Sequence, residues 1–208
     1  MKKTILLAFY ISISTVIFAQ GGIDFGIKGG LNLAHLHKSS FKIRSGIHAG
    51  VFADYTINKY FGIQGELLYS MMGAKEKYAV MDGYYDVDGY VYKGYYDVKA
   101  TLKNDYIVLP ILAKLYMAKG FSLDLGPQFG YMISKKEKIN ISGDKPATWY
   151  YPNGVDNKFD IAFAMGLSYK LNKRFDISGR YNLGLTDVGN GYKSKNNVIQ
   201  FGIGYRLK

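Results

Sequence analysis

The chain has 208 residues and a formal net charge of +11, a length that suits one domain with a sizeable core. Glycine and tyrosine are abundant (25 and 20 residues, with 12 Phe), whereas proline is scarce at 4. Cysteine is absent, which excludes disulfide frameworks, thiolate zinc sites and lipid attachment at a cysteine.

Residues 1–19 have the pattern of a Sec signal peptide. The basic start "MKK" precedes an apolar run from Thr4 to Phe18, and Ala19 supplies a small residue before the expected cut. The run is too short for a membrane helix, and no second apolar helix follows it. We therefore expect residues 1–19 to be cleaved and residues 20–208 to form one exported domain.

Eight later segments alternate apolar and polar or small residues, which is typical of a β-strand with two unlike faces. In chain order they are 23–33, 45–56, 61–72, 104–115, 121–132, 159–170, 174–186 and 197–207. Each is long enough to cross a bilayer as a tilted strand. The connections alternate between long and short, as they do in membrane barrels with tight periplasmic turns and longer extracellular loops.

The apolar face of these strands is predicted to meet lipid. If it faced inward, its large side chains would overfill an eight-stranded lumen, and the outer wall would be largely glycine. Aromatic residues such as Tyr55, Phe121 and Tyr169 cluster at the short-turn end, as an interfacial girdle does. The sequence thus predicts an all-β, eight-stranded, antiparallel up-and-down transmembrane barrel of OmpX/OmpA-like architecture. A soluble lipocalin-like barrel, with the apolar face inward, is the alternative.

Several phrases carry a family resemblance: "NKYFGIQGELLYS" (58–70), "LPILAKLY" (109–116), "LGPQFGYMIS" (125–134), "FDIAFAMGLSYKL" (159–171) and "GRYNLGLTDV" (179–188). Together they resemble the PorT-like outer-membrane β-barrel family of Bacteroidetes. The resemblance implies a barrel in the outer membrane of a Gram-negative, Bacteroidetes-like bacterium. It also implies a possible role as an accessory of a protein-secretion or envelope-assembly system, and it carries no catalytic motif. Val108 departs from the acidic residue that relatives often have before "LP".

Ionisable residues at the alternate, inward positions are predicted to form a lumen charge network. By counting from the short-turn end, Lys28, Glu66 and Arg180 fall at nearly the same height. The other members are Asp54, Lys114, Asp124, Asp176 and Arg206, with Asp24, Asp160 and Lys170 also inward. Buried charges need partners, so we expect a paired, plugged lumen; an ion or substrate path is the alternative.

The second long connection, 73–103, is rich in tyrosine and contains "GYYDV" twice. It supplies the candidate extracellular binding residues Tyr84, Tyr85, Tyr90, Tyr92, Tyr95 and Tyr96. Tyrosine offers a large, rigid contact area with a polar tip, which suits a recognition hairpin. Equally, the alternating tyrosines continue the two flanking strands as a twisted ribbon.

The third long connection, 133–158, holds a second aromatic group, Trp149, Tyr150 and Tyr151, which is a further candidate contact. Basic residues gather near the predicted outer rim and suit lipopolysaccharide phosphates. The candidate lipopolysaccharide contacts are Lys38, Lys42, Arg44, Lys135, Lys136 and Lys138. A solvated basic rim without a specific ligand is the alternative.

For function, we expect a non-enzymatic structural or binding barrel with extracellular recognition loops, and a secretion accessory is the alternative. The expected partners are membrane lipid, lipopolysaccharide and an extracellular ligand or secretion proteins, without nucleic acid or cofactor. His35 and His37 beside Ser39 and Ser40 suggest a lipid-modifying hydrolase, but no motif positions a nucleophile, base and orienting group. That enzyme ranks third, and a pore ranks fourth.

Overall fold

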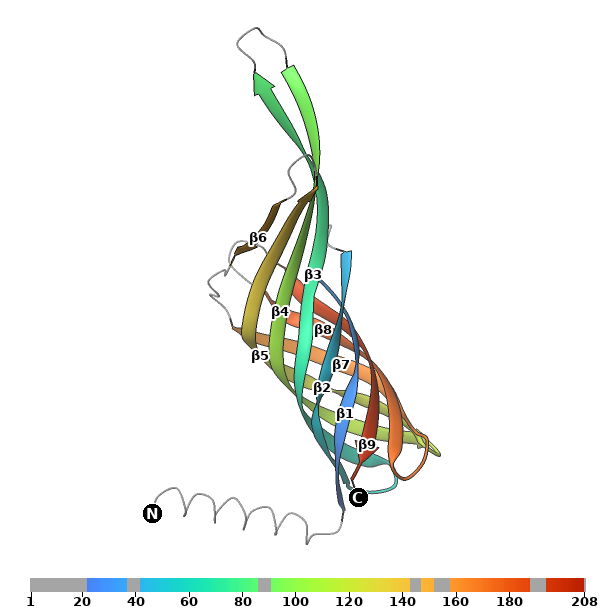
Figure 1. Cartoon of the computed structure of the whole chain (residues 1–208). Helices are drawn as coiled ribbons and strands as arrows, with labels where there is room; N and C mark the ends of the chain where they lie inside the picture. The colour runs from blue at the N-terminus through green and yellow to red at the C-terminus, as the bar shows by residue number, and fades with distance from the viewer. Residues whose placement is uncertain are drawn as a thin grey trace, which may run out of the picture.

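The computed structural model describes residues 22–36, 42–85, 91–142, 147–151, 158–187 and 194–207. Within them the chain forms one antiparallel sheet (Figure 1). Its strands are β1 (Ile23–Leu36), β2 (Lys42–Thr56), β3 (Phe61–Tyr85), β4 (Val91–Ala118), β5 (Phe121–Ser142), β6 (Ala147–Tyr151), β7 (Phe159–Lys170), β8 (Phe175–Asp187) and β9 (Lys195–Arg206).

Eight of these strands close into a ring. The order is β4-β3-β2-β1-β9-β8-β7-β5, and an additional β4–β5 pairing joins the two ends. Sequence neighbours pair around the ring, and β1 pairs with β9 from Gly26↔Arg206 to Leu36↔Asn196. The predicted eight-stranded, up-and-down antiparallel barrel is therefore confirmed. β6 lies outside the ring, and among the described strands it pairs only with β5, for example at Ile139↔Trp149.

Two of the short turns have the same construction because they carry the same residue pattern, "INKYF" (57–61) and "LNKRF" (171–175). The side-chain oxygen of Asn58 accepts hydrogen bonds from the backbone N–H groups of Tyr60 and Phe61. Asn172 does the same for Arg174 and Phe175. This Asx turn reverses the chain without needing a glycine. The β4–β5 turn is tighter and uses Gly120 at φ +87°.

The apolar face points outward, as predicted. On β3, Leu67 is 51 % exposed while its neighbour Leu68 is 1 % exposed. The same alternation runs along β7 and β9. Gly65 shares the outer face of β3 with Leu67 by alternation, and it has no atom within 4 Å of where a Cβ would lie. The structure rules out the lipocalin-like alternative, because that barrel would bury this face.

Three strands extend well beyond their predicted ends. β3 and β4 stay paired up to Tyr85↔Val91, so they project from the long-loop end of the ring as a two-stranded ribbon (Figure 1). The C-terminal end and the short turns lie at the opposite end. β5 continues to Ser142, where it pairs with Asp97 of β4. The tyrosine-rich segment thus continues the two flanking strands as a ribbon, which is one of the two interpretations given above.

Pro110 lies in the middle of β4 without producing a bulge. The β3–β4 register is the same on both sides of it, with Gly65↔Ile111 before and Leu68↔Val108 after. The ladder is interrupted between these pairs, since proline has no N–H to donate. The register of β4 against β5 shifts elsewhere, between Asp105 and Tyr106 and between Tyr116 and Ala118.

Candidate functional site

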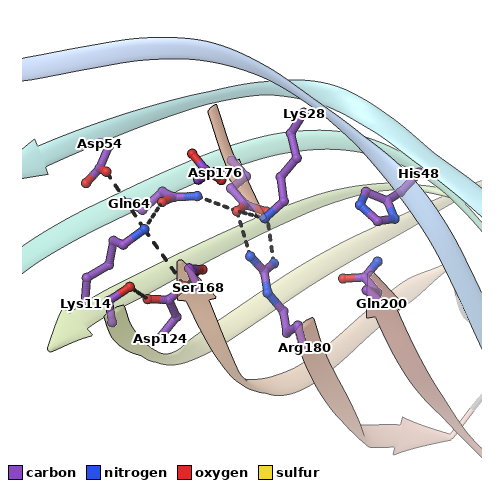
Figure 2. Close-up of polar contacts among 12 residues, drawn as sticks. Lys28, His48, Asp54, Gln64, Lys114, Asp124, Ser168, Asp176, Arg180 and Gln200 are labelled. Atoms are coloured by element: carbon purple, nitrogen blue, oxygen red, sulfur yellow. Dashed lines mark hydrogen bonds and ion pairs between the residues drawn. The ribbon is translucent and has the colours of Figure 1, made fainter. Parts of the chain in front are cut away.

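A three-residue ion cluster occupies the middle of the lumen. The ammonium of Lys28 on β1 lies 2.9 Å from Glu66 Oε1 on β3. The guanidinium of Arg180 on β8 donates to both carboxylate oxygens of Glu66, at 2.7 and 2.9 Å. All three side chains are buried. Figure 2 shows the side chains of Lys28 and Arg180 pointing toward the same group, and in the ring β8 lies opposite β3, which carries Glu66. The structure thus brings together the three residues that counting placed at one height.

A second polar cluster lies next to the first, toward the short-turn end. Lys114 Nζ donates to Gln64 at 2.7 Å, and Gln64 in turn donates to Glu66 at 2.6 Å. The same ammonium lies 3.8 Å from Asp54 and 3.9 Å from Asp124 (Figure 2). This bridge connects the central ion cluster to the carboxylates at the lower end of the lumen.

Arg206, the last residue of β9, lies close to three carboxylates at the short-turn end of the lumen. Its guanidinium lies 3.2 Å from Asp54, 3.0 Å from Asp176 and 3.6 Å from Asp24. Ser122 and Ser168 both donate to Asp124 beside this group. The eight members of the predicted lumen charge network, from Lys28 to Arg206, therefore each have at least one ionic partner inside the ring, as does Asp24. Asp160 instead accepts hydrogen bonds from Thr186 and Asn196.

A chain of neutral polar groups lies beyond the ion cluster toward the long-loop end. A ring nitrogen of His48 is 2.7 Å from the side-chain oxygen of Asn32, which also accepts from Gln200 at 3.1 Å. Asn182 donates to Gln200 at 2.8 Å. Sequence reasoning considered only charged groups and so missed this layer. The alternation that identified Asp54 also places His48 on the inward face.

Above the amide chain, the lumen contains an apolar cluster that sequence analysis did not predict. It consists of Ala34, Leu68, Met72, Tyr106, Val108, Met132 and Val198. Leu68 and Met72 share the inward face of β3 with Glu66, since all three lie at alternate positions. The signal was available in the sequence: large apolar residues at even positions of β3 had to point inward if Leu67 pointed outward.

The ribbon carries most of the candidate tyrosines. Its ladder sets Tyr84 opposite Tyr92, and it sets Tyr95 and Tyr96 opposite Met81 and Val80. The second aromatic group, Trp149, Tyr150 and Tyr151, belongs to β6 and pairs with β5. Tyr90, one of the predicted contacts, lies outside the described residues. Within the described part of the chain, no strand pairs with the second edge of β3 beyond Lys75.

Lysines oppose one another repeatedly where the ribbon meets the ring. The ladder pairs are Lys42↔Lys75, Lys77↔Lys99 and Lys103↔Lys136, each between neighbouring strands. Like charges directly opposite each other destabilise a sheet, so this arrangement favours an anion between them. We call Lys42, Lys75, Lys77, Lys99, Lys103 and Lys136 the outer lysine patch. Lys135 and Lys138 neighbour it on β5 and are half-buried.

Arg44 does not belong with these surface lysines, and its prediction as a lipopolysaccharide contact is corrected. It is 6 % exposed, and its guanidinium donates to the carbonyl of Met72 inside the ring. β2 begins at Lys42, before its predicted start, and this turns Arg44 inward. Lys38 lies outside the described residues, as do His37, Ser39 and Ser40 of the hydrolase alternative. Residues 1–19, the predicted signal peptide, lie outside them as well.

Two features are absent from the described residues. No group of three or more His, Asp or Glu side chains there is placed to hold a metal ion. No helix there is long and apolar enough to cross a membrane.

Comparison with known proteins identifies the family. The profile of the outer membrane protein beta-barrel domain matches residues 18–190, which is most of the chain. This chain belongs to the outer-membrane β-barrel family. No curated protein matches its sequence.

Solved outer-membrane β-barrels are among the similar structures. Neisserial surface protein A matches at 13 % identity and a TM-score of 0.50, over 89 % of this chain and 99 % of that one. Ail of Yersinia pestis, solved in complex with the heparin analogue sucrose octasulfate, matches at 15 % identity and a TM-score of 0.46, with the same coverage. OmpW of E. coli matches at 11 % identity and a TM-score of 0.39, over 90 % of this chain and 99 % of that one.

Membership of the outer-membrane β-barrel family places the protein in the outer membrane of a Gram-negative bacterium. It also orients the molecule, because barrels of this kind have short periplasmic turns and longer extracellular loops. By this rule we expect the β3–β4 ribbon and the outer lysine patch to be extracellular and Arg206 to lie at the periplasmic mouth. The narrower assignment to PorT-like proteins of Bacteroidetes stays a prediction.

Proposed function

We propose that this barrel is a non-enzymatic surface-binding protein whose β3–β4 ribbon contacts a ligand outside the cell. One observation carries the proposal: the β3–β4 ladder continues past Lys75, the last residue of β3 that pairs with β2, to Tyr85↔Val91. That extension contributes nothing to spanning the bilayer. A two-stranded ribbon is marginally stable in water by itself, so its length points to a role in contact.

The chemistry of the ribbon supports this role. Tyrosines at 84, 85, 92, 95 and 96 provide large, rigid side chains that lose little entropy on binding. The edge of β3 from Glu76 to Tyr85 also has unpaired backbone groups within the described part of the chain. An unpaired edge can accept an extended strand from a partner, with main-chain hydrogen bonds supplying affinity.

Lipopolysaccharide is the proposed partner of the outer lysine patch. The patch lies at the end of the lipid-facing wall. Lys103 is on the same face of β4 as Ile107 and Leu109 by alternation, and both of these apolar residues are exposed on the outside of the ring. Phosphates placed between opposed lysines would remove the repulsion within each pair. The barrel would thereby be held upright in the outer leaflet with the ribbon projecting from it.

The first test is trypsin treatment of intact cells, followed by unheated and boiled SDS gels of the outer-membrane fraction. We expect a heat-modifiable band that trypsin shortens near Lys93 or Lys99, whereas Lys119, on a periplasmic turn, is cut only after lysis. A barrel that trypsin cannot shorten at the ribbon would count against surface recognition. It would favour the secretion-accessory alternative, in which a partner covers the loops.

The second test replaces ribbon tyrosines. Tyr84, Tyr92, Tyr95 and Tyr96 are changed to Ser in one variant, and Lys77 and Lys99 to Gln in a matched variant. Both are displayed on cells over an array of extracellular proteins and glycans. We expect the tyrosine variant to lose the spots that wild type binds, while its heat-modifiable band is unchanged. Equal binding by wild type and the tyrosine variant would contradict a recognition role for the ribbon.

A further inference from the structure

The lipid-facing wall has a hollow of about 550 Å³ near the periplasmic end. Its outward lining comes from β1, β5, β7, β8 and β9 and includes Leu31, Phe121, Leu167, Tyr169, Ile177, Phe201 and Ile203. Gly29 and Gly179 form its floor, because a Cβ at either position would meet no atom closer than 3.7 Å. Two glycines thus leave a recess where neighbouring strands present large apolar side chains.

A basic cleft of about 710 Å³ adjoins the same end of the barrel. Lys119, Lys170, Lys173 and Arg206 line it, with Asp24 as its one acid. Arg206 is already engaged with carboxylates of the lumen. Lys119 and Lys173 lie on two periplasmic turns, are exposed, and have no ion pair among the described residues. The cleft therefore has positive charge in excess of its own acids.

Tyr169 joins the two features, since it lines both the hollow and the cleft. Its ring packs on Phe121, with ring centroids 4.4 Å apart, at the start of β5. Aromatic residues at this height mark the boundary between acyl chains and headgroups. The apolar hollow thus lies on the acyl side of that boundary and the basic cleft on the headgroup side.

We propose that the cleft and the hollow together bind one anionic phospholipid of the periplasmic leaflet. Its phosphate lies between Lys119 and Lys173, and one acyl chain lies over Gly29 and Gly179. Moving an acyl chain from other lipid onto the protein gains little hydrophobic free energy. The favourable contribution therefore comes from close van der Waals packing of the acyl chain in the recess. The lysines supply the preference for a negative headgroup, since each basic residue near a membrane surface attracts anionic lipid.

The test is native mass spectrometry of the purified full-length barrel with added phosphatidylglycerol or phosphatidylcholine that have the same acyl chains. We expect phosphatidylglycerol to be retained more strongly, by roughly fivefold for each contributing lysine. The double substitution Lys119→Gln and Lys173→Gln should remove this preference. Lys59→Gln, on a turn that does not line the cleft or the hollow, should keep it.

Filling the hollow tests the acyl half of the site. Gly179→Leu places a side chain in the recess and should lower retention of both lipids. Gly65→Leu is the matched control, because Gly65 is also on the outer face but lies outside the hollow. Heat-modifiable gel migration verifies that each variant is folded.

Several results would overturn the proposal. Equal retention of the two lipids would do so, as would a Gly179→Leu variant that binds like wild type. Displacement of phosphatidylglycerol by glycerol phosphate, which lacks acyl chains, would mean a site for a free anion. Dimerisation that Gly179→Leu abolishes would mean that the hollow receives a second copy of the chain.

Discussion

Arg180 and Glu66 form a two-pronged ion pair across the lumen, joining β8 to β3 with N···O distances of 2.7 and 2.9 Å. Both side chains are buried, and Lys28 adds a third charge at 2.9 Å from the same carboxylate. A pair of this geometry matches the planar guanidinium to the carboxylate and fixes both side chains. Because both cations share Glu66, we expect substitutions of the three residues to differ in their effect on the free energy of unfolding.

Replacing the shared acid should be costly. Glu66→Gln leaves Lys28 and Arg180 as two buried cations without a counter-charge, and we expect a loss of about 3–5 kcal/mol in the free energy of unfolding. Lys28→Met should cost less, because Arg180 still neutralises Glu66. Urea unfolding in lipid vesicles, followed by gel migration, measures both. If Lys28→Met were the more damaging change, the assigned partner would be wrong.

Leu68 and Leu67 are adjacent in sequence but face opposite sides of the wall, so they form a direct comparison. Leu68→Ala opens a cavity in the apolar cluster of the lumen and should cost about 2–5 kcal/mol in unfolding free energy. Leu67→Ala should cost less, since lipid chains move into the space it leaves. The same vesicle unfolding assay compares them. Equal losses would indicate that the cluster is loosely packed.

The ion clusters and the apolar layer predict a barrel that does not conduct. Eight-stranded barrels have an interior that side chains can fill, and the apolar layer adds a stretch with few groups to replace an ion's water. Planar-bilayer recordings should therefore show no steady conductance, with a wide porin as the positive control. A reproducible unit conductance that Leu68→Ala enlarges would revive the pore alternative.

The effect of the outer lysine patch on the stability of the barrel should change sign with its environment. In detergent without lipopolysaccharide, Lys77→Gln and Lys103→Gln should each stabilise the barrel by about 0.2–1 kcal/mol, because each relieves a like-charge pair. With lipopolysaccharide present, wild type should gain more stability than either variant. Urea midpoints with and without the lipid measure the reversal, and high salt should weaken both effects. Destabilisation in both conditions would show that the lysines have structural partners.

Much of the barrel could be predicted from the sequence because period-two alternation and connection lengths are local signals. β7 has the same bounds as its predicted segment, 159–170, and the inward acids follow from the same alternation. The extensions of β3 and β4 were harder to predict. Outside the bilayer both faces of a ribbon are wet, so the apolar signal that marks a membrane strand stops near Met72 although the pairing continues.

Side-chain partners inside the lumen depend on register, which a single sequence does not supply. Arg44 illustrates this, because an earlier start of β2 turned a presumed surface cation into a buried donor to Met72. The apolar cluster was missed for another reason: the lumen was expected to hold charges and small residues. A narrow barrel needs both polar and apolar filling, and Leu68 and Val108 provide the latter.

The seam between β1 and β9 has a consequence for biogenesis. Lumen contacts that bridge it or lie near it connect residues far apart in the chain, such as Gln200 with Asn32 and Arg206 with Asp54. Contacts of such high sequence separation form late. Until residues 195–206 arrive, two strand edges and several unpaired charges would face lipid, which the bilayer does not tolerate. The seam must therefore close at the same time as the interior charges are neutralised. The barrel must enter the bilayer either as a closed ring or with an assembly factor that shields both strand edges.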